Sequence, residues 1–441
     1  MKRMNNDFFS LSDYIHDVSR VELLQVVGKV IQVVGLVIEA QVQGVCIGEL
    51  CRIVVDEKRT ILSEVVGFKE EKVLLMPLGP ISGIKPGSKI YATGHPIEVK
   101  VGPKLLGRIL DGLGNPMDRK GELEYETIYP IDRDPPDPVQ RPRISQILKA
   151  GVKAIDGVLT LGRGQRIGIF AGSGVGKSTL MGMLARNCEA DVNVISLVGE
   201  RGREVKDFIE ESLGEEGLKK SVVVCATSDN PPVIRLKGAL VGTAIAEYFR
   251  DQGKNVLFMM DSVTRFAMAQ REIGLATGEP PTTKGYTPSV FAMLPRLMER
   301  AGTSDKGSIT AIYTVLVDGG DMDEPIADAA RGILDGHMVL SRDLAAKNHY
   351  PCIDINQSVS RLFSVICGPD QKTAAGKLRE VLARYSEAED LINIGAYAKG
   401  SNPKIDNAIS KIDAVNAFLC QGTLENIGFE DAVKTLTRIF G

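Results

Sequence analysis

The chain has 441 residues, 44% hydrophobic and 25% charged, which is the composition of a globular protein large enough for two or three domains. Its 53 basic and 56 acidic side chains leave a net charge of −3, which disfavours a general nucleic-acid binder because such proteins usually carry a basic excess. The seven cysteines form no C-x-x-C pair, so they give no support to a zinc or thioredoxin site and fit a reducing compartment.

The N-terminus lacks the apolar core of a signal peptide, and we find no apolar run of about eighteen residues, so we expect a cytoplasmic protein. Residues 1–20 carry a rough helical stripe of apolar and aromatic side chains ahead of the first strand-like run. The stripe consists of Phe8, Phe9, Leu11, Tyr14, Ile15 and Val18. Its spacing predicts a helix that packs on its own domain or binds a partner, and spacing by itself favours the first.

From 21 to 94, short β-branched runs such as "CRIVVDE" and "EKVLLMPL" are separated by Gly, Lys-Glu or Pro-Gly, which predicts a small all-β barrel or sandwich. Residues 95–145 are rich in loop signals. In this part "LGRILDGLGNPMD" has turn composition, and "DRDPPDPVQRPR" holds four prolines in twelve residues. Because proline removes a backbone donor, the second stretch cannot be an internal strand or helix, and we predict an extended connection wrapped on the next domain.

After residue 145, apolar strand-like runs alternate with helical patterns. The runs are "QRIGIF", "VNVISLVGE", "SVVVCATS", "NVLFMMDS" and "SITAIYTVLV". Buried strands separated by helices predict an α/β fold with a parallel sheet covered on both faces. In the last part "LREVLARY" has helical spacing, which predicts a helical tail. The predicted organisation is a terminal helix at 1–20, a barrel at 21–94, an α/β domain at 95–370 and a helical domain at 371–441.

A glycine-rich loop, "AGSGVGKST" at 171–179, joins the first of these strands to a helix. A strand, a glycine loop ending in Gly-Lys-Ser and a helix form a phosphate loop, whose backbone N–H groups and helix N-terminus attract phosphate. Lys177 supplies a charge to the terminal phosphates, and the Ser178 hydroxyl can hold magnesium. Ala171 stands where the strict pattern has glycine, a tolerated variant because Gly172 and Gly174 still serve the turn. We therefore predict Mg-ATP as the ligand.

Two acidic residues end strands of the same predicted sheet. Asp261 closes "NVLFMMDS", and because parallel strands end at one edge, it is expected to complete the metal site near the loop. Glu200, in "LVGERGRE", ends the strand after the loop helix and has the chemistry of a general base. Spacing leaves an exposed turn residue equally open for Glu200, and it leaves the neighbouring Arg201 and Arg203 free to serve phosphate, structure or solvent.

These motifs together resemble the type III secretion ATPases, and most closely the flagellar protein export ATPases, which are related to the catalytic subunits of rotary ATP synthases. The resemblance rests on "AGSGVGKST", "LVGERGREV", "MDSVTRFAMAQREI", "GEPPTTKGYTPSVFAMLPRLMERAG" and "DGHMVLSRDLAAKNHYPCIDINQSVSR", and it extends from about residue 25 to the C-terminus. It implies a P-loop NTPase core of the RecA-like type between a β-barrel and a helical domain.

The resemblance also implies roles for individual residues. Glu200 would polarise the attacking water, with Arg201 beside it, and Asp261 would belong to the metal site. Arg265 would lie near the terminal phosphate, Tyr350 would stack on adenine, and Arg361 would be an arginine finger inserted by a neighbouring subunit. The nucleotide phosphates would be bound by Gly172, Ser173, Gly174, Val175, Gly176, Lys177, Ser178 and Thr179. Nothing in spacing or periodicity indicates the roles of Tyr350 or Arg361.

Partners follow from the resemblance as well. The family forms homohexameric rings at the cytoplasmic face of a membrane export gate, with a coiled-coil stalk protein in the pore. A negative regulator binds its N-terminal segment, which makes residues 1–20 a candidate regulator-binding helix. Hydrolysis releases chaperones and delivers export substrates. Four alternatives stay open: a virulence secretion ATPase, a rotary ATP synthase subunit, an RNA translocase and a non-catalytic nucleotide-binding subunit. The last is disfavoured by the presence of both Lys177 and Glu200, and the RNA translocase by the scarcity of aromatic residues in 21–94.

Overall fold

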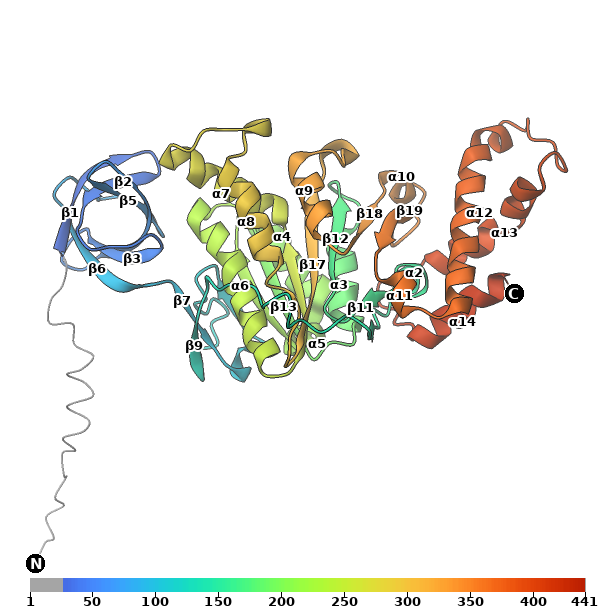
Figure 1. Ribbon diagram of the computed structural model, residues 1–441, viewed down its shortest axis with the longest axis horizontal. Helices are drawn as coiled ribbons and strands as arrows, with labels where there is room; N and C mark the ends of the chain where they lie inside the picture. The colour runs from blue at the N-terminus through green and yellow to red at the C-terminus, as the bar shows by residue number, and fades with distance from the viewer. Residues whose placement is uncertain (1–26, 441) are drawn as a thin grey trace, which may run out of the picture. The chain divides into compact units, whose positions relative to one another are not determined.

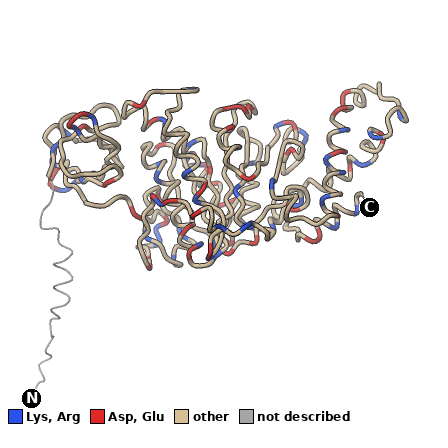
Figure 2. Tube along the Cα trace, viewed as in Figure 1, with Lys and Arg blue, Asp and Glu red and all other residues tan. Residues whose placement is uncertain are grey.

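The computed structural model describes residues 27–440, and the predicted helix at 1–20 lies outside them (Figure 1). The chain divides into two compact units, one ending at Ile97 and the other beginning at Glu98. Within residues 27–440, we find no helix that is long and apolar enough to cross a membrane. Basic and acidic residues are interspersed along the described parts of both units (Figure 2).

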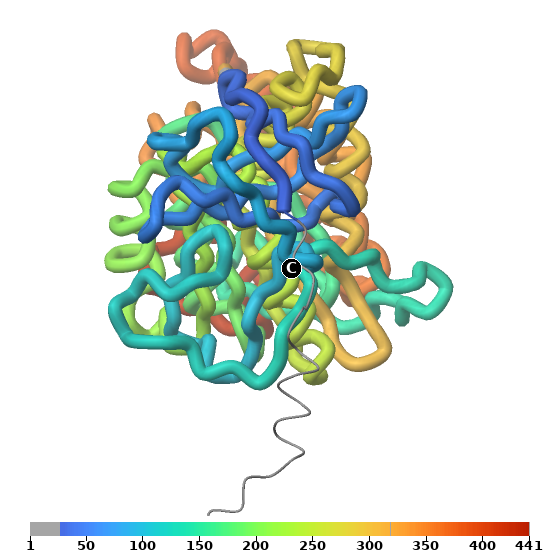
Figure 3. Tube along the Cα trace, turned by 90° about the vertical axis from the view of Figure 1, so that its left-hand side faces the viewer, coloured from blue at the N-terminus to red at the C-terminus, as the bar shows by residue number. Residues whose placement is uncertain are grey.

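The first unit is a closed antiparallel barrel, drawn in blue in Figure 3. Its strands are β1 (Val27–Val34), β2 (Val37–Gln41), β3 (Glu49–Val54), β4 (Thr60–Lys69), β5 (Lys72–Pro77) and β6 (Lys89–Pro96), and the strand order around the barrel is β1-β2-β5-β4-β3-β6. Alternate residues such as Ile38, Ile53 and Leu75 point inward and are fully buried. The apolar run at 28–42 forms two strands, because Gly35 takes a left-handed conformation (φ 58°) in the tight turn between them.

The second unit is built around a nine-stranded sheet within residues 98–440. Its main order is β19-β18-β12-β17-β15-β13-β14-β8, and β16 pairs with β17. The bounds are β8 (Ile109–Asp111), β12 (Arg166–Ala171), β13 (Val192–Val198), β14 (Ser221–Ala226), β15 (Asn255–Asp261), β16 (Gly302–Thr303), β17 (Ser308–Leu316), β18 (Gly336–Leu340) and β19 (Ile353–Ser360). The central strands are parallel and buried, which confirms the predicted α/β class. The antiparallel pairing of β18 with β19 at one edge has no counterpart in the sequence prediction.

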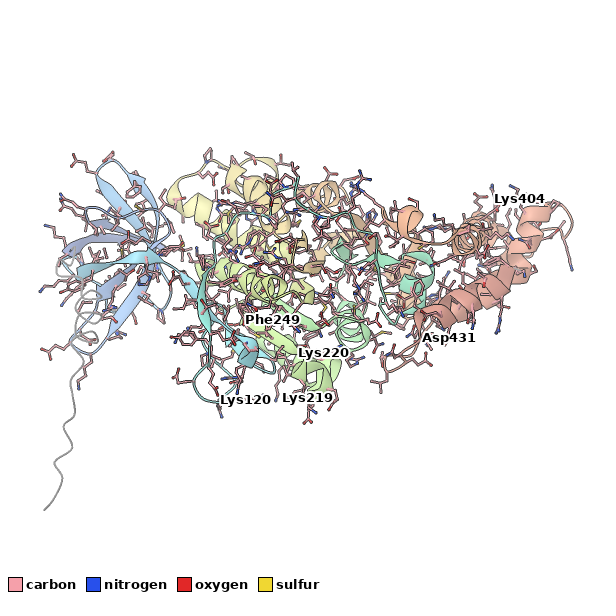
Figure 4. All side chains as sticks on the ribbon, turned by 60° about the horizontal axis from the view of Figure 1, so that its bottom comes forward. Lys120, Lys219, Lys220, Phe249, Lys404 and Asp431 are labelled. Atoms are coloured by element: carbon pink, nitrogen blue, oxygen red, sulfur yellow. The ribbon has the colours of Figure 1, made fainter. Side chains whose placement is uncertain are left out.

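Helices cover both faces of this sheet. On β13, Ser196 lies against α6, while the alternating residues Ile195 and Leu197 join the core that includes Leu180 and Leu184 of α3. The helices between strands are α2 (Lys153–Val158), α3 (Lys177–Asn187), α4 (Gly202–Asp207), α5 (Gly214–Lys219), α6 (Pro232–Asp251), α7 (Val263–Thr277), α8 (Pro288–Met298), α9 (Pro325–Ile333) and α10 (Arg342–Ala346), and the short helix α11 (Phe363–Ile366) follows the last strand. A π-helical turn, η2 (Phe208–Leu213), joins α4 to α5, and Figure 4 labels Lys219 and Lys220 where α5 leads into β14. Three 3-10 turns complete the set: η1 (Pro103–Leu105), η3 (Thr283–Gly285) and η4 (Asp318–Gly320).

The segment predicted to be loop-rich at 95–145 contains more strand than expected. β7 (Glu98–Val101) pairs with β9 (Thr127–Pro130), and β8 joins the edge of the main sheet beside β14. The interpretation of "LGRILDGLGNPMD" as turns alone was therefore wrong. Its Ile109–Asp111 portion is a strand because β14 leaves an open parallel edge for it. The proline-rich stretch at 132–143 contains no strand or helix, as predicted. After it, β10 (Ile147–Leu148) pairs with β11 (Leu161–Gly162).

The chain ends in three helices, α12 (Pro369–Asn393), α13 (Pro403–Leu419) and α14 (Phe429–Phe440), as the helical spacing predicts. Leu378, Val415 and Leu436 are buried between them and join the core of the second unit. Lys404, labelled in Figure 4, bridges α13 to α12 through Glu380 at 3.3 Å.

Candidate active site

The glycine loop lies at the carboxyl edge of the sheet, between the end of β12 and the start of α3. Gly174 and Gly176 both have φ of 79°, a left-handed conformation in which a side chain would be strained. The loop opens on a cavity of about 640 Å³. Of the predicted site residues, the following line this cavity: Gly172, Ser173, Gly174, Gly176, Lys177, Ser178, Thr179, Glu200, Arg201, Asp261 and Arg265. The structure thus brings together residues that are up to 93 positions apart, from Gly172 to Arg265.

Lys177 lies between the two acidic residues that end β15 and follow β13. Its Nζ is 2.5 Å from Asp261 Oδ1 and 3.4 Å from Glu200 Oε1, and Asp261 also accepts a hydrogen bond from Thr314 at 2.6 Å. All three charged side chains are largely buried. Without this lysine, two carboxylates would face each other in a poorly solvated site.

Burial, with the neighbouring charge of Asp261, raises the pKa of Glu200 to about 7, against the opposing effect of Lys177. A carboxylate that titrates near neutral pH has the basicity that a general base needs. Glu204, one helical turn further along the chain, lines the same cavity and also raises the pKa of Glu200 through a side-chain hydrogen bond. Glu204 and Phe208 are cavity residues that the sequence analysis missed, since both look like ordinary residues of an amphipathic helix.

The cavity fits a phosphate ligand with magnesium. Arg265 has a buried Nε without a hydrogen-bond partner among residues 27–440, a cost that an anionic ligand would remove. Ser178 and Asp261 supply oxygen atoms, the ligands that Mg²⁺ prefers, and the cavity leaves room for water and phosphate. Mg²⁺ held by these residues would supply positive charge to neutralise the phosphate oxygens.

A second cavity of about 360 Å³ adjoins the other side of the loop. Val175 and Tyr350 line it, and the Tyr350 ring lies 3.7 Å from the point where a Cβ on Gly176 would be. Tyr350 is 40% exposed and borders this cavity, where a flat ligand such as a base could contact its ring. Gln421 and Thr423, from the connection between α13 and α14, complete the wall. Their sequence context carries no signal for this position, because they follow the loop by more than 200 residues.

Arg361 lies in neither cavity. It follows β19, its backbone N–H donates to Asp335 O at 3.0 Å, and its exposed guanidinium donates to Arg331 O at 3.3 Å. Arg201 lines the first cavity but is 80% exposed and pairs with Glu204 at 3.4 Å. Within one chain, the site therefore has its phosphate loop, its carboxylates and the adjoining second cavity, while Arg361 lies outside both cavities.

Comparison with known proteins agrees with this architecture. Residues 30–94 match the beta-barrel domain of the ATP synthase alpha/beta family, and residues 151–360 match the nucleotide-binding domain of the same family. Residues 367–438 match the C-terminal domain of the type III secretion ATPase EscN.

Individual relatives match over nearly their whole length. The chain is 56% identical to the flagellum-specific ATP synthase of Bacillus subtilis, over 94% of this chain and 95% of the relative. It is 53% identical to the type 3 secretion system ATPase of Xanthomonas euvesicatoria, over 93% of each chain. Among solved structures, the assembled ATPase EscN of enteropathogenic E. coli matches with a TM-score of 0.90 and 45% identity, covering 94% of this chain and 100% of EscN. EscN in complex with its central stalk EscO matches with a TM-score of 0.87 and 44% identity, with the same coverage. The chain therefore belongs to the family of flagellar and type III secretion export ATPases.

Proposed function

We propose that this protein hydrolyses Mg-ATP as a homohexameric ring and thereby energises flagellar protein export. The observation that carries the proposal is the joint placement of Lys177, Asp261 and Glu200 in the phosphate-loop cavity, with Arg361 outside it. Lys177 binds the terminal phosphates, and Ser178 with Asp261, the latter through water, holds magnesium. Glu200 accepts a proton from the attacking water.

The base of ATP stacks on Tyr350 in the second cavity. Arg265 binds the terminal phosphate through its unpartnered nitrogen, and Arg201 adds a charge at the cavity rim. Arg361 acts as a finger in the site of a neighbouring subunit, where it stabilises charge that develops on the phosphoryl group. Its exposed position outside both cavities supports this assignment.

Mixing two inactive variants tests the finger. Arg361→Ala should bind ATP and assemble but keep only a small residual turnover, and Lys177→Ala should lack turnover because its own loop is disabled. In a mixed ring, an intact loop can meet an intact Arg361 from its neighbour, so activity should reappear. A mixture of wild-type and Lys177→Ala subunits calibrates the effect of one disabled site on the ring. Mixed variants that stay inactive while the calibration mixture remains active would place the finger within its own chain.

The assembly and partners are proposed from the relatives. We propose a central stalk protein in the ring, export gate proteins at the membrane, and chaperone–substrate complexes as clients, with the ATPase in the cytoplasm at the inner face of the membrane. Residues 1–20 are proposed to bind a negative regulator, and their removal should abolish regulator binding while hydrolysis is retained. A truncated protein with a melting temperature several degrees lower would instead favour a helix packed on its own domain.

Three experiments separate the alternatives. Deleting the gene should abolish flagellar filaments. Loss of effector secretion alone would instead indicate a virulence system, an alternative that stays open because the Xanthomonas relative is named a type 3 secretion system ATPase. The purified chain should hydrolyse ATP by itself, with specific activity that rises with protein concentration, whereas a rotary synthase subunit would need other chains. Polynucleotides should leave hydrolysis unchanged, in contrast to an RNA translocase.

A further inference from the structure

The edge strand that leads to Arg361 carries a wide bulge. β18 and β19 pair antiparallel, with His337 opposite Val359 and Val339 opposite Asp354. Residues 355–358 of β19 therefore lie opposite Met338 alone, and two regular pairs, those of Val359 and Ser360, separate this bulge from Arg361. Bulges of this kind redirect the side chains that follow them and are frequent beside active sites.

The bulge decides where Arg361 lies. Continuing the register of the Val339–Asp354 pair would place Gly336 opposite Gln357, whereas it faces Ser360, three residues later. At a rise of about 3.3 Å per residue, the bulge shifts the end of β19 by about 10 Å along β18. This shift places the Arg361 N–H at Asp335 O.

The strand pair closes tightly again after the bulge. A Cβ on Gly336 would lie 2.3 Å from Val359 O, so the two backbones approach where a larger residue has no room. Ser360 donates to Thr160 O at 2.9 Å and accepts from Gln165 at 3.1 Å. These contacts fix the position of the end of β19. Because they follow the bulge directly, they form only if the bulge keeps its length of four residues.

Polar side chains of the sheet hold part of the bulge. The Asp354 carboxylate accepts the N–H groups of Asn356 and Gln357, each at 3.0 Å, and the Gln357 side-chain amide at 2.8 Å. The His337 ring contacts Gln357 O at 3.0 Å. Side chains of β18 and β19 themselves thus provide hydrogen-bond partners for the backbone of residues 356 and 357.

Arg379 holds the bulge from the helical part of the second unit. It lies on α12, and its guanidinium donates to Ile355 O through Nη1 and to Ser358 O through Nη2, the latter at 3.1 Å. The two carbonyls are the first and last of the bulge, so one rigid planar group spans its whole width. Burial lowers the pKa of Arg379, and the nearby Asp354 charge opposes that shift. Because this half-buried arginine directs its guanidinium at two backbone carbonyls, it fixes the conformation of the bulge.

We propose that Arg379 is a positioning residue for Arg361: it holds the 355–358 bulge and thereby places the arginine that acts in the neighbouring subunit. The proposal rests on the finger role of Arg361 proposed above. It links the helical region of one subunit to hydrolysis in the next, because the residue that shapes the finger comes from α12.

Arg379→Met tests this proposal, because methionine keeps an unbranched apolar side chain but cannot donate to the carbonyls. We expect kcat to fall about 10- to 100-fold, since small misplacements of a catalytic group have effects of this size. The equilibrium affinity for ATP and the assembly of the ring should be unchanged. Arg379→Lys keeps the charge without the planar fork and should recover part of kcat. The matched control is Arg384→Met on the same helix, whose guanidinium bonds Glu387 beside it at 2.8 Å and should leave kcat unchanged.

Two further measurements separate positioning from general damage. In an Arg361→Ala background, single-turnover rates should show no further loss on adding Arg379→Met, since the group being positioned is absent. Lys177→Ala subunits carry intact fingers, so adding them should raise the activity per Arg379→Met subunit. Adding them to wild-type subunits at the same ratio should give no such rise.

Other outcomes overturn the proposal. A loss of ATP affinity at constant kcat would assign Arg379 to its own site, and an equal loss of rate in the Arg361→Ala background would assign it a general structural role. A drop in melting temperature that accounts for the lost activity would do the same. If Arg361→Ala itself keeps a normal kcat, the finger assignment fails first and the positioning role fails with it, whereas failure of Arg379→Met alone leaves the finger intact.

Discussion

Glu200→Gln separates binding of ATP from its hydrolysis. Glu200 Oε1 lies 3.4 Å from Lys177 Nζ, and burial with the charge of Asp261 raises the pKa of Glu200 to about 7. Glutamine keeps the size and hydrogen-bonding capacity of the side chain but cannot take a proton from water. The substitution also removes a negative charge from the cavity that receives the phosphates.

The expected magnitude follows from the role of a general base. Loss of a positioned base typically costs a factor of about 10² to 10⁴ in rate, or about 3 to 5 kcal/mol in the barrier. ATP affinity should stay equal or increase, because repulsion between a carboxylate and the phosphates is removed. With a pKa raised to about 7, the Glu200 carboxyl changes its protonation state within the neutral pH range. The wild-type kcat/KM should therefore rise with pH through about 7, and this rise should be missing from Glu200→Gln.

Steady-state ATPase assays between about pH 6 and 8.5 and equilibrium dialysis with labelled ATP measure these effects. Glu211→Gln, an exposed glutamate on the π-helical turn, serves as a control for removing one negative charge nearby and should leave both quantities unchanged. Near-normal turnover by a folded Glu200→Gln protein would refute the assignment. Loss of ATP binding together with turnover would show that Glu200 supports the site rather than the chemistry.

Three other substitutions test the site and its support. Lys177→Ala removes both ion pairs that this lysine makes and should lower ATP affinity at least about tenfold and abolish turnover; dialysis that finds wild-type affinity would contradict the phosphate role. Arg300→Met should lower the free energy of unfolding by about 3 to 5 kcal/mol in urea titrations, because the fully buried Glu247 loses a bidentate partner. Adding Glu247→Leu should recover most of that loss, and an unrecovered loss would point to packing instead. Gln421→Ala removes the acceptor of the Lys153 N–H and the donor to Gly151 O, which hold this wall residue of the second cavity, and should raise KM for ATP several-fold with kcat little changed; a fall in kcat alone would disprove its role in that wall.

The sequence by itself determined the parts of the site that depend on local geometry. The loop at 171–179 could be predicted because a strand, left-handed glycines and a helix N-terminus follow one another directly along the chain. Asp261 and Glu200 could be predicted to lie near it because parallel strands all deliver their carboxyl ends to one edge. The α/β class and the barrel followed from apolar runs and turn residues, which are also short-range signals.

The tertiary structure alone decided the contacts between segments far apart in the sequence. β8 became a strand because β14 offers an edge more than 100 residues later, although its own residues have turn composition. Gln421 lines the second cavity because the helical region packs beside the loop helix, and nothing in its neighbouring sequence indicates that place. Arg379 and the bulge of β19 depend on each other. The sequence of the strand does not predict a four-residue bulge, and the sequence of the helix does not predict that an arginine binds it. Such features form only when two segments pack together. Their stabilising free energy comes from contacts between the two segments, so the sequence of either segment alone does not predict them.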